Sequence, residues 1–281
     1  MIFFLTSHSL WLSGFIIVGL GTVLAMIGPS VVRHFVGLKR LTTNNEIAGF
    51  KFATVGVLYA VLLAFAIIVV WQKYSDAETT VAQEAGAAAS IFQLSYGIDE
   101  KPGTALRSAL SNYLAHAITD DWQAMEQVMP GGSPSARQGL DSVYTALLTF
   151  QSNSPVDAAV LAEILHQVDM LTQARRVRLV EAEGVVPGVV WLILFGGAIV
   201  TLGFTFFFGA ESLRAQTLMT ALLAVLMLSE LFIIVAIDRP FTGSVKVEPT
   251  ALAEVLKDFG PGPGPGPGTS ANAPQIAPPQ H

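Results

Sequence analysis

The stretch FATVGVLYAVLLAFAIIVVW, residues 52–71, runs without interruption into QKYSDAETTVAQEAGAAASIFQLSY, residues 72–96. The first part contains no charged residue. As a helix it reaches about 30 Å, which is the thickness of the hydrocarbon core of a bilayer. The second part contains no proline, and its Ala, Glu and Gln favour a helix. The two parts together predict one helix that crosses a membrane and continues into water.

Three further apolar runs have the same character. Residues 10–32 and 187–209 carry no charge, and residues 215–237 are interrupted only by Glu230. The composition agrees, because 52% of the residues are hydrophobic and only 13% are charged, against about a quarter in a soluble domain. Aromatic residues lie near several run ends, as expected at a lipid–water interface: Trp11, Trp71 and Trp191. We therefore predict an all-α integral membrane protein with four transmembrane helices and an inserted extramembrane helical bundle.

The first run also raises the question of a cleaved signal peptide. No Lys or Arg precedes it, it is longer than a signal-peptide core, and no A-x-A cleavage site follows it. We expect a retained helix. The predicted regions are the first two spans (1–71), the extramembrane helical domain (72–186), the last two spans (187–237), a short C-terminal segment (238–259) and a disordered Pro/Gly-rich tail (260–281).

The inserted region shows the breaks of a helical bundle. Pro102-Gly103 separates a helix ending near Tyr96 from one over 104–129, and the PGGSP stretch at 130–134 precedes a third helix over about 135–151. Ser154 is a typical N-cap for a fourth helix that runs towards the third span. This region holds 14 of the 21 acidic residues and seven of the 15 Lys and Arg residues, a formal balance of −7. Such an acidic domain excludes nucleic acid as a partner.

Enzyme motifs are missing from the sequence. It contains no cysteine, no G-x-S-x-G, no phosphate-binding loop, no G-x-G-x-x-G and no H-E-x-x-H. His116 and Asp120 are four residues apart, and a second polar group is spaced by threes: Glu163, His166 and Asp169. Such spacing holds a metal only where another helix adds ligands, and a solvated helix face produces it by chance. We predict no enzyme activity, no catalytic residue, no metal site and no cofactor.

Five small residues in the second span form a stripe on one helical face: Gly49, Ala53, Gly56, Ala60 and Ala64. Small residues let helix backbones approach closely in lipid. Two arrangements fit this stripe. It packs against another helix of the same chain, or it forms a close-packed or pore-lining face at the axis of a symmetric oligomer.

Glu230 is the one ionisable residue deep within a predicted span. A charge at the centre of a bilayer costs about 2.5–3.5 kcal/mol, so such a residue usually faces protein or water. A protonated structural carboxyl and an ion-path or gating carboxylate both fit. Three basic residues precede the third span, Arg175, Arg176 and Arg178. They suit pairing with Glu181, Glu183 and the acidic helices better than binding of lipid headgroups.

Several strings resemble the bacterial bestrophin-like family of uncharacterised membrane proteins. They are Asn45-Glu46-x-Ala48-Gly49-Phe50, Gly56-Val57-x-Tyr59-Ala60-Val61-Leu62-x-Ala64-Phe65, Trp71-x-x-Tyr74-x-x-Ala77 with Glu84-Ala85, Asp121-Trp122-x-x-Met125, the 175–179 segment before Pro187-x-x-x-Trp191, and Asp238-Arg239-Pro240-Phe241-x-Gly243. The resemblance covers about residues 10–257. Its motifs are moderately specific, and the family has no established activity to carry over.

The family's name implies similarity to bestrophins, which are pentameric anion channels. These have four spans, cytoplasmic termini and a helical cytoplasmic domain that extends from the second and third spans. The acidic calcium clasp and the Phe-rich neck of animal bestrophins are not found in this sequence. The flanking Lys and Arg residues do not decide the orientation, and the resemblance favours a cytoplasmic domain.

The sequence therefore predicts a homo-oligomer in the bacterial inner (plasma) membrane, surrounded by the lipid bilayer. Its termini and the 72–186 domain are expected in the cytoplasm. The function we expect is an ion channel, with inorganic anions as the permeant species. The alternative is a non-conducting scaffold or sensor whose helical domain binds a partner.

Overall fold

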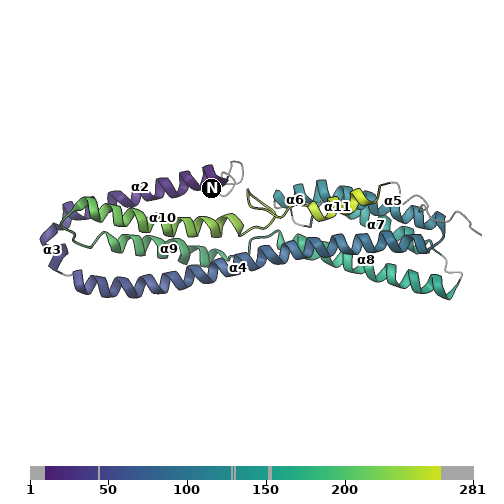
Figure 1. The fold of residues 1–281 in the computed structure, drawn as a ribbon, viewed down its shortest axis with the longest axis horizontal. Coiled ribbons are helices and arrows are strands. Elements are labelled where there is room, and N and C mark those ends of the chain that lie inside the picture. Colours follow the sequence, from purple (N-terminus) through teal and green to yellow (C-terminus); the bar gives the residue numbers. More distant parts are fainter. Residues whose placement is uncertain (1–9, 44, 128, 130, 151–153, 261–281) are drawn as a thin grey trace, which may run out of the picture.

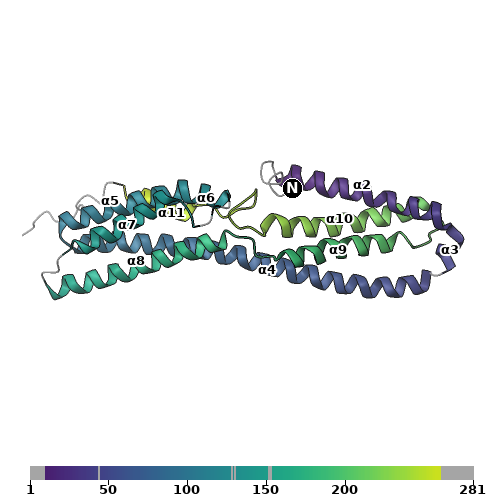
Figure 2. The same cartoon turned by 180° about the vertical axis from the view of Figure 1, so that it is seen from behind.

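The computed structural model describes residues 10–43, 45–127, 129, 131–150 and 154–260. Helices make up these residues almost entirely, and no strand occurs among them. The molecule is elongated and consists of two helical bundles placed end to end (Figure 1 and Figure 2). One helix, α4 (Asn45–Leu94), belongs to both bundles. Its 50 residues correspond to about 75 Å.

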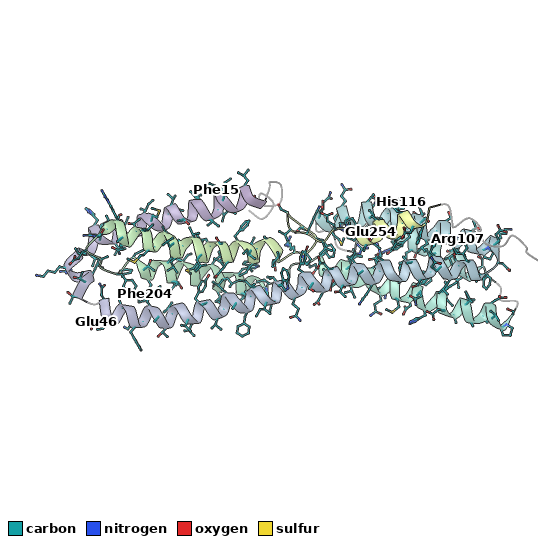
Figure 3. All side chains as sticks on the ribbon, in the orientation of Figure 1. Phe15, Glu46, Arg107, His116, Phe204 and Glu254 are labelled. Atoms are coloured by element: carbon teal, nitrogen blue, oxygen red, sulfur yellow. The ribbon has the colours of Figure 1, made fainter. Side chains whose placement is uncertain are left out.

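Four helices among the described residues are long and apolar enough to cross a membrane. They are α2 (Leu10–Val36), α4, α9 (Gly188–Thr205) and α10 (Leu213–Ile237). Their outer side chains are exposed, as lipid-facing residues would be. Phe15, for example, is 80% exposed and points away from the bundle (Figure 3). The four predicted apolar runs thus correspond to four long helices in a single bundle.

The membrane-type bundle packs mainly through α10. This helix lies against α2 on one side and against α4 and α9 on the other. The short helix α3 (Leu38–Thr43) connects α2 to α4 at the end farthest from the second bundle, and the loop between α9 and α10 lies at the same end (Figure 1). The buried core contains Leu63, Leu194 and Ile234, from three different helices.

The second bundle continues from α4. It contains the 3₁₀ turn η1 (Ser95–Gly97), α5 (Glu100–His116), the π-helical turn η2 (Ala117–Asp121), α6 (Trp122–Glu126), α7 (Pro134–Leu148) and α8 (Pro155–Glu181). α4 packs against α8, and α5 packs against α7. Its core is formed by fully buried residues such as Ile91, Leu110 and Leu171.

Two helix starts of this bundle follow from N-caps. The hydroxyl of Ser133 accepts the N–H of Ala136, and the hydroxyl of Ser154, as predicted, accepts the N–H of Asp157 at 3.1 Å. The expected start at residue 104 is wrong, because α5 begins at Glu100 and contains Pro102 in its first turn. Proline is tolerated there, since the N–H it lacks would have no partner within the helix.

The C-terminal segment folds back onto the second bundle. After α10, Phe241 and Val247 are buried, and α11 (Thr250–Asp258) packs against α4 and α5. The ring of Phe259 stacks on Phe92 with centroids 3.9 Å apart. The tail beyond residue 260 lies outside the described residues. α4 runs through the expected boundary at residue 72 without a break, and the division into domains stays a prediction.

Candidate functional site along the second span

The small-residue stripe of α4 is not covered by the chain's own helices. Ala53, Ala60 and Ala64 are exposed. A Cβ added to Gly56 would meet nothing within 4 Å, and one added to Gly49 would meet only Phe208, at 4.0 Å. Packing against a helix of the same chain therefore does not account for the stripe. It faces lipid or another molecule.

A neighbouring face of α4 packs within the bundle. The buried hydroxyl of Tyr59 donates a hydrogen bond to the carbonyl oxygen of Leu194, at 2.9 Å. A Cβ at Gly197 would lie 2.5 Å from the Tyr59 ring, so only glycine lets α9 approach this closely. Glu230 of α10 is half-buried and interacts electrostatically with Tyr59. The structure thus places Glu230 beside the packed face of α4.

One uncovered line of residues follows α4 through both bundles. We call it the α4 line, and its members are spaced by three or four residues: Phe50, Thr54, Val57, Val61, Ala64, Ile68, Gln72, Ser75, Thr79, Ala82, Gly86, Ser90 and Gln93. All are exposed except Ser90, which is half-buried. None carries a charge. The line is apolar in the membrane-type bundle, and it consists of small and uncharged polar side chains in the second bundle.

A buried charge network fixes α4 within the second bundle. Arg178 of α8 is fully buried and donates to both oxygens of Glu84 of α4, from Nε at 2.6 Å and from Nη2 at 3.0 Å. The hydroxyl of Tyr113 donates to Oε1 of the same carboxylate at 2.6 Å. The guanidinium also lies over the ring of Trp122, 4.6 Å from its centroid.

A second carboxylate completes this network. Asp121, also fully buried, accepts two hydrogen bonds from Arg175 at 2.9 and 3.1 Å and one from Nη2 of Arg178 at 3.2 Å. The backbone N–H of Ser133 donates to it at 2.7 Å. Gly132 makes this contact possible. Its φ of +71° is one that other residues rarely adopt, and a Cβ at this position would lie only 2.8 Å from the Asp121 carboxylate, so only glycine fits. Two carboxylates thus balance two guanidiniums.

The electrostatics of this network favour the charged forms. Burial alone raises the pKa of the Asp121 carboxyl, but Arg175, Arg178 and the Ser133 N–H outweigh burial and hold the pKa below its ordinary value. Burial also lowers the pKa of Arg178, and the Glu84 carboxylate more than reverses this. The Tyr113 hydroxyl stays protonated, since burial and the neighbouring Glu84 raise its pKa.

Two carboxyl groups lie at the junction of the bundles. Asp238, just after α10, accepts the backbone N–H groups of Val185 and Val186 at 3.2 and 2.9 Å, which anchors the start of α9. Glu181 ends α8, and its Oε2 is buried with no hydrogen-bond partner within the described ranges. Burial is the main cause that raises the pKa of both carboxyls.

Comparison of the sequence with models of known protein families identifies the family of this chain. A model described as a bestrophin-like domain matches residues 19–252 of the chain. The chain belongs to the bestrophin-like family. No curated protein matches the sequence.

Solved structures agree with this assignment at the level of the fold. A bestrophin homologue from Klebsiella pneumoniae carrying one substitution has a TM-score of 0.66 to this bestrophin-like chain, at 14% identity, and the match covers 88% of this chain and 98% of that one. A second variant of the Klebsiella homologue gives a TM-score of 0.65 at 11% identity, covering 86% and 97%. A crystal structure described only as a membrane protein gives 0.68 at 11% identity, with the same coverage.

Sequence reasoning located some of these bestrophin-like residues and missed others. Arg175 and Arg178 do pair with acidic helices, but their partners are Glu84 and Asp121, whereas Arg176 is exposed. Glu84 was quoted only within a family motif, and its pairing with Arg178 was not predicted, although the alanines around it were a signal. His116 pairs with Asp120 at 3.0 Å. The described residues hold no group of three or more His, Asp or Glu that could bind a metal.

Proposed function

We propose that this bestrophin-like chain forms a homo-oligomer around an ion-conducting path, with the α4 line facing the axis. The observation that carries the proposal is the continuity of this line, which stays uncovered and uncharged along a helix of 50 residues. A symmetric arrangement of several copies would turn one such line per chain into a continuous wall.

The water-exposed half of the line supports this arrangement. The bundle around it is acidic, yet Ser75, Thr79, Ala82 and Gly86 offer only small or uncharged side chains on this side of α4. A helix face that simply meets bulk water usually carries charges. Small residues suit close approach of copies, and hydroxyl and amide groups can replace part of an ion's hydration shell.

The membrane half of the line supports a narrow apolar segment. Val57, Val61 and Ile68 are 64%, 48% and 57% exposed, and the neighbouring small residues of the stripe permit helices to come close. Apolar constrictions in channels gate by losing and regaining water. We infer a gate of this kind between residues 57 and 68.

Anions are the proposed permeant species. Cation channels commonly use rings of carboxylates, and the α4 line contains none. Its hydroxyl and amide groups can donate hydrogen bonds to an anion. The similarity of the family to bestrophins points the same way. Glu230, beside Tyr59 on the packed face, is proposed as a structural carboxyl rather than a pore-lining one.

Purified protein in proteoliposomes tests conduction and the position of the path together. Ile68→Ser should wet the constriction and raise chloride flux, whereas Ile16→Ser on the exposed side of α2 should leave flux at the wild-type level. Wild-type protein that carries no chloride, or equal effects of the two substitutions, would favour the scaffold alternative.

Assembly is tested separately from conduction. Gly56→Leu should reduce the oligomer to smaller species in detergent, because a bulky side chain forces backbones apart. Gly19→Leu on α2, where an added Cβ also meets nothing within 4 Å, is the matched control and should keep the native size. A wild-type protein that is a uniform monomer would refute the oligomer.

We further propose that the protein lies in the inner membrane with the second bundle and both termini in the cytoplasm. A fusion after Gly260 reports this without disturbing the fold, since α11 ends at Asp258. A fluorescent protein fused there should fluoresce, and alkaline phosphatase should be inactive. The reverse pattern would place the bundle in the periplasm.

A further inference from the structure

The end of α8 joins the second bundle to the third span. α8 ends at Glu181, the linker 182–187 follows, and α9 begins at Gly188, where the two bundles meet (Figure 1). One carboxyl group lies on each side of this linker. Glu181 is the last residue of α8, and Asp238 is the C-cap of α10. Both positions disfavour a negative charge, because the last carbonyl groups of a helix carry partial negative charge themselves.

The two carboxyl groups differ in their partners. Asp238 is 8% exposed and accepts the N–H groups of Val185 and Val186, so it holds the linker. The Glu181 carboxyl accepts a hydrogen bond from the Thr80 hydroxyl, but its Oε2 is buried and has no partner in the described part of the chain. A buried ionised oxygen without a donor is far less favourable than a buried neutral one. The position of Glu181 therefore suits the protonated acid.

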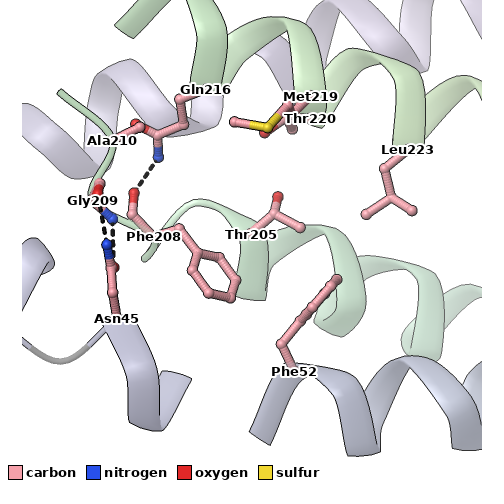
Figure 4. A pocket seen from close by; sticks show the side chains of 10 residues that line it. All are labelled: Asn45, Phe52, Thr205, Phe208, Gly209, Ala210, Gln216, Met219, Thr220 and Leu223. Carbon is pink, nitrogen blue, oxygen red and sulfur yellow. Dashed lines mark hydrogen bonds between the residues drawn. The ribbon is translucent and has the colours of Figure 1, made fainter. Parts of the chain in front are cut away.

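Glu181 differs from the other described side chains that have a buried atom without a partner. These are Thr22 and Gln216, both in the membrane-type bundle. Thr22 is a hydroxyl, and the Gln216 amide is held by a hydrogen bond from its Nε2 to the carbonyl oxygen of Phe208 (Figure 4). Neither a hydroxyl nor an amide ionises near neutral pH, whereas a carboxyl group does. Of the three residues, only Glu181 can change its charge with pH.

The charged groups that face Glu181 come from α4. Burial and the neighbouring Asp76 disfavour its carboxylate, and they outweigh Lys73, so the pKa of Glu181 lies above its ordinary value. Lys73 and Arg239 also favour the carboxylate of Asp238. No salt bridge joins Lys73 to either carboxyl group within the described ranges. An ionised Glu181 would gain by moving towards Lys73 and water, whereas the neutral acid has no such gain.

We propose that Glu181 is a proton-operated latch between the two bundles. When protonated, it stays buried against Thr80 and holds the end of α8 on α4. When ionised, it leaves this position for Lys73 or water, and the linker 182–187 loosens at the start of the third span. The latch is therefore closed at acidic pH and opens as pH rises. It does not depend on the proposed conduction.

Hydrogen exchange of the full-length protein in detergent, read by mass spectrometry, tests the latch. The readout is the protection factor of peptides that cover residues 182–186, measured from pH 4.5 to 8 and corrected for the intrinsic effect of pH on exchange. Wild-type protection should fall by about tenfold as pH rises by one unit past the transition, because the ratio of ionised to neutral carboxyl changes by this factor.

Two variants test the role of the proton. Glu181→Gln imitates the neutral acid and should keep the acid-state protection at every pH. Lys73→Met removes an attraction for the carboxylate, so it should move the transition to higher pH. A role of Glu181 that does not involve ionisation would give neither response.

Two further variants assign the transition to Glu181. Exposed Glu183→Gln, two residues away, should keep the wild-type transition. Asp238→Asn removes the other junction carboxylate, while its side-chain oxygen can still accept from Val185 and Val186, and it should also keep a transition. Wild-type protection that is constant from pH 4.5 to 8, a transition that persists in Glu181→Gln, or one that is lost in a normally melting Asp238→Asn protein would overturn the proposal.

Discussion

Replacing Arg178 by Met should strongly destabilise the second bundle. The side chain volume changes little, but Glu84 loses both of its hydrogen bonds to a cation, at 2.6 and 3.0 Å, and keeps only the Tyr113 hydroxyl. Unit charges about 4 Å apart interact by about 4 kcal/mol at an effective dielectric constant of 20. Removing one partner of a buried ion pair typically costs about 3–5 kcal/mol of folding stability. We expect a loss in this range.

Thermal unfolding in detergent measures this loss. For a protein of this size about 3–5 kcal/mol corresponds to a fall in Tm of roughly 6–20 °C. Arg176→Met is the control, because Arg176 is two residues away and exposed, and it should shift Tm by about 2 °C or less. Adding Glu84→Gln to Arg178→Met removes the unpaired charge and should recover part of the stability. Equal melting of the Arg178 and Arg176 variants, or no recovery in the double variant, would refute the reasoning.

Three other predictions concern the junction and the membrane-type bundle. The raised pKa of Glu181 means that the folded state disfavours its carboxylate. The resulting loss of stability is present above the raised pKa, and it disappears as pH falls through the raised pKa towards the ordinary value of 4.5. Glu181→Gln should therefore raise Tm at pH 7–8 and lose this advantage near pH 4–5, while exposed Glu183→Gln should do neither; an advantage that is independent of pH would contradict this. Gly197→Ala should destabilise the folded protein by about 1–3 kcal/mol, because the new Cβ would lie 2.5 Å from the Tyr59 ring. The adjacent Gly196→Ala is the control: its Cβ would meet nothing within 4 Å, so it should be neutral in the same melting assay. Glu230→Gln should leave chloride flux unchanged from pH 5 to 8 and Glu230→Leu should lower Tm; altered flux in the Gln variant would assign Glu230 to the ion path.

The helices were predictable because their signals are local. Each span is a long apolar run, and the continuity of α4 follows from the absence of proline between residues 52 and 96. The expected helix over 104–129 is really α5, a π-helical turn and α6. That turn ends at Asp121, which contacts Arg175 across 54 positions, a pairing that no local pattern encodes.

The candidate site was only partly predictable for the same reason. The stripe from Gly49 to Ala64 was visible in the sequence, but whether another helix of the chain covers it depends on how α9 and α10 pack. The water-exposed half of the α4 line was missed, since Ser75, Thr79 and Gly86 look like ordinary surface residues until the rest of the bundle is seen to leave them uncovered. The pairing of Glu84 with Arg178 was not predicted, because a Glu is rarely fully buried and its partner lies 94 positions away.

An unbroken α4 also acts as a lever. A rod of about 75 Å that tilts by about 5° displaces its far tip by roughly 6–7 Å. Spans tilt to match the thickness of the surrounding bilayer, so a thinner or thicker membrane changes the inclination of α4. With no hinge between Asn45 and Leu94, that inclination reaches Ser90 and Gln93 undiminished. The spacing of these residues between neighbouring copies would then report, far from the lipid, how thick the membrane is.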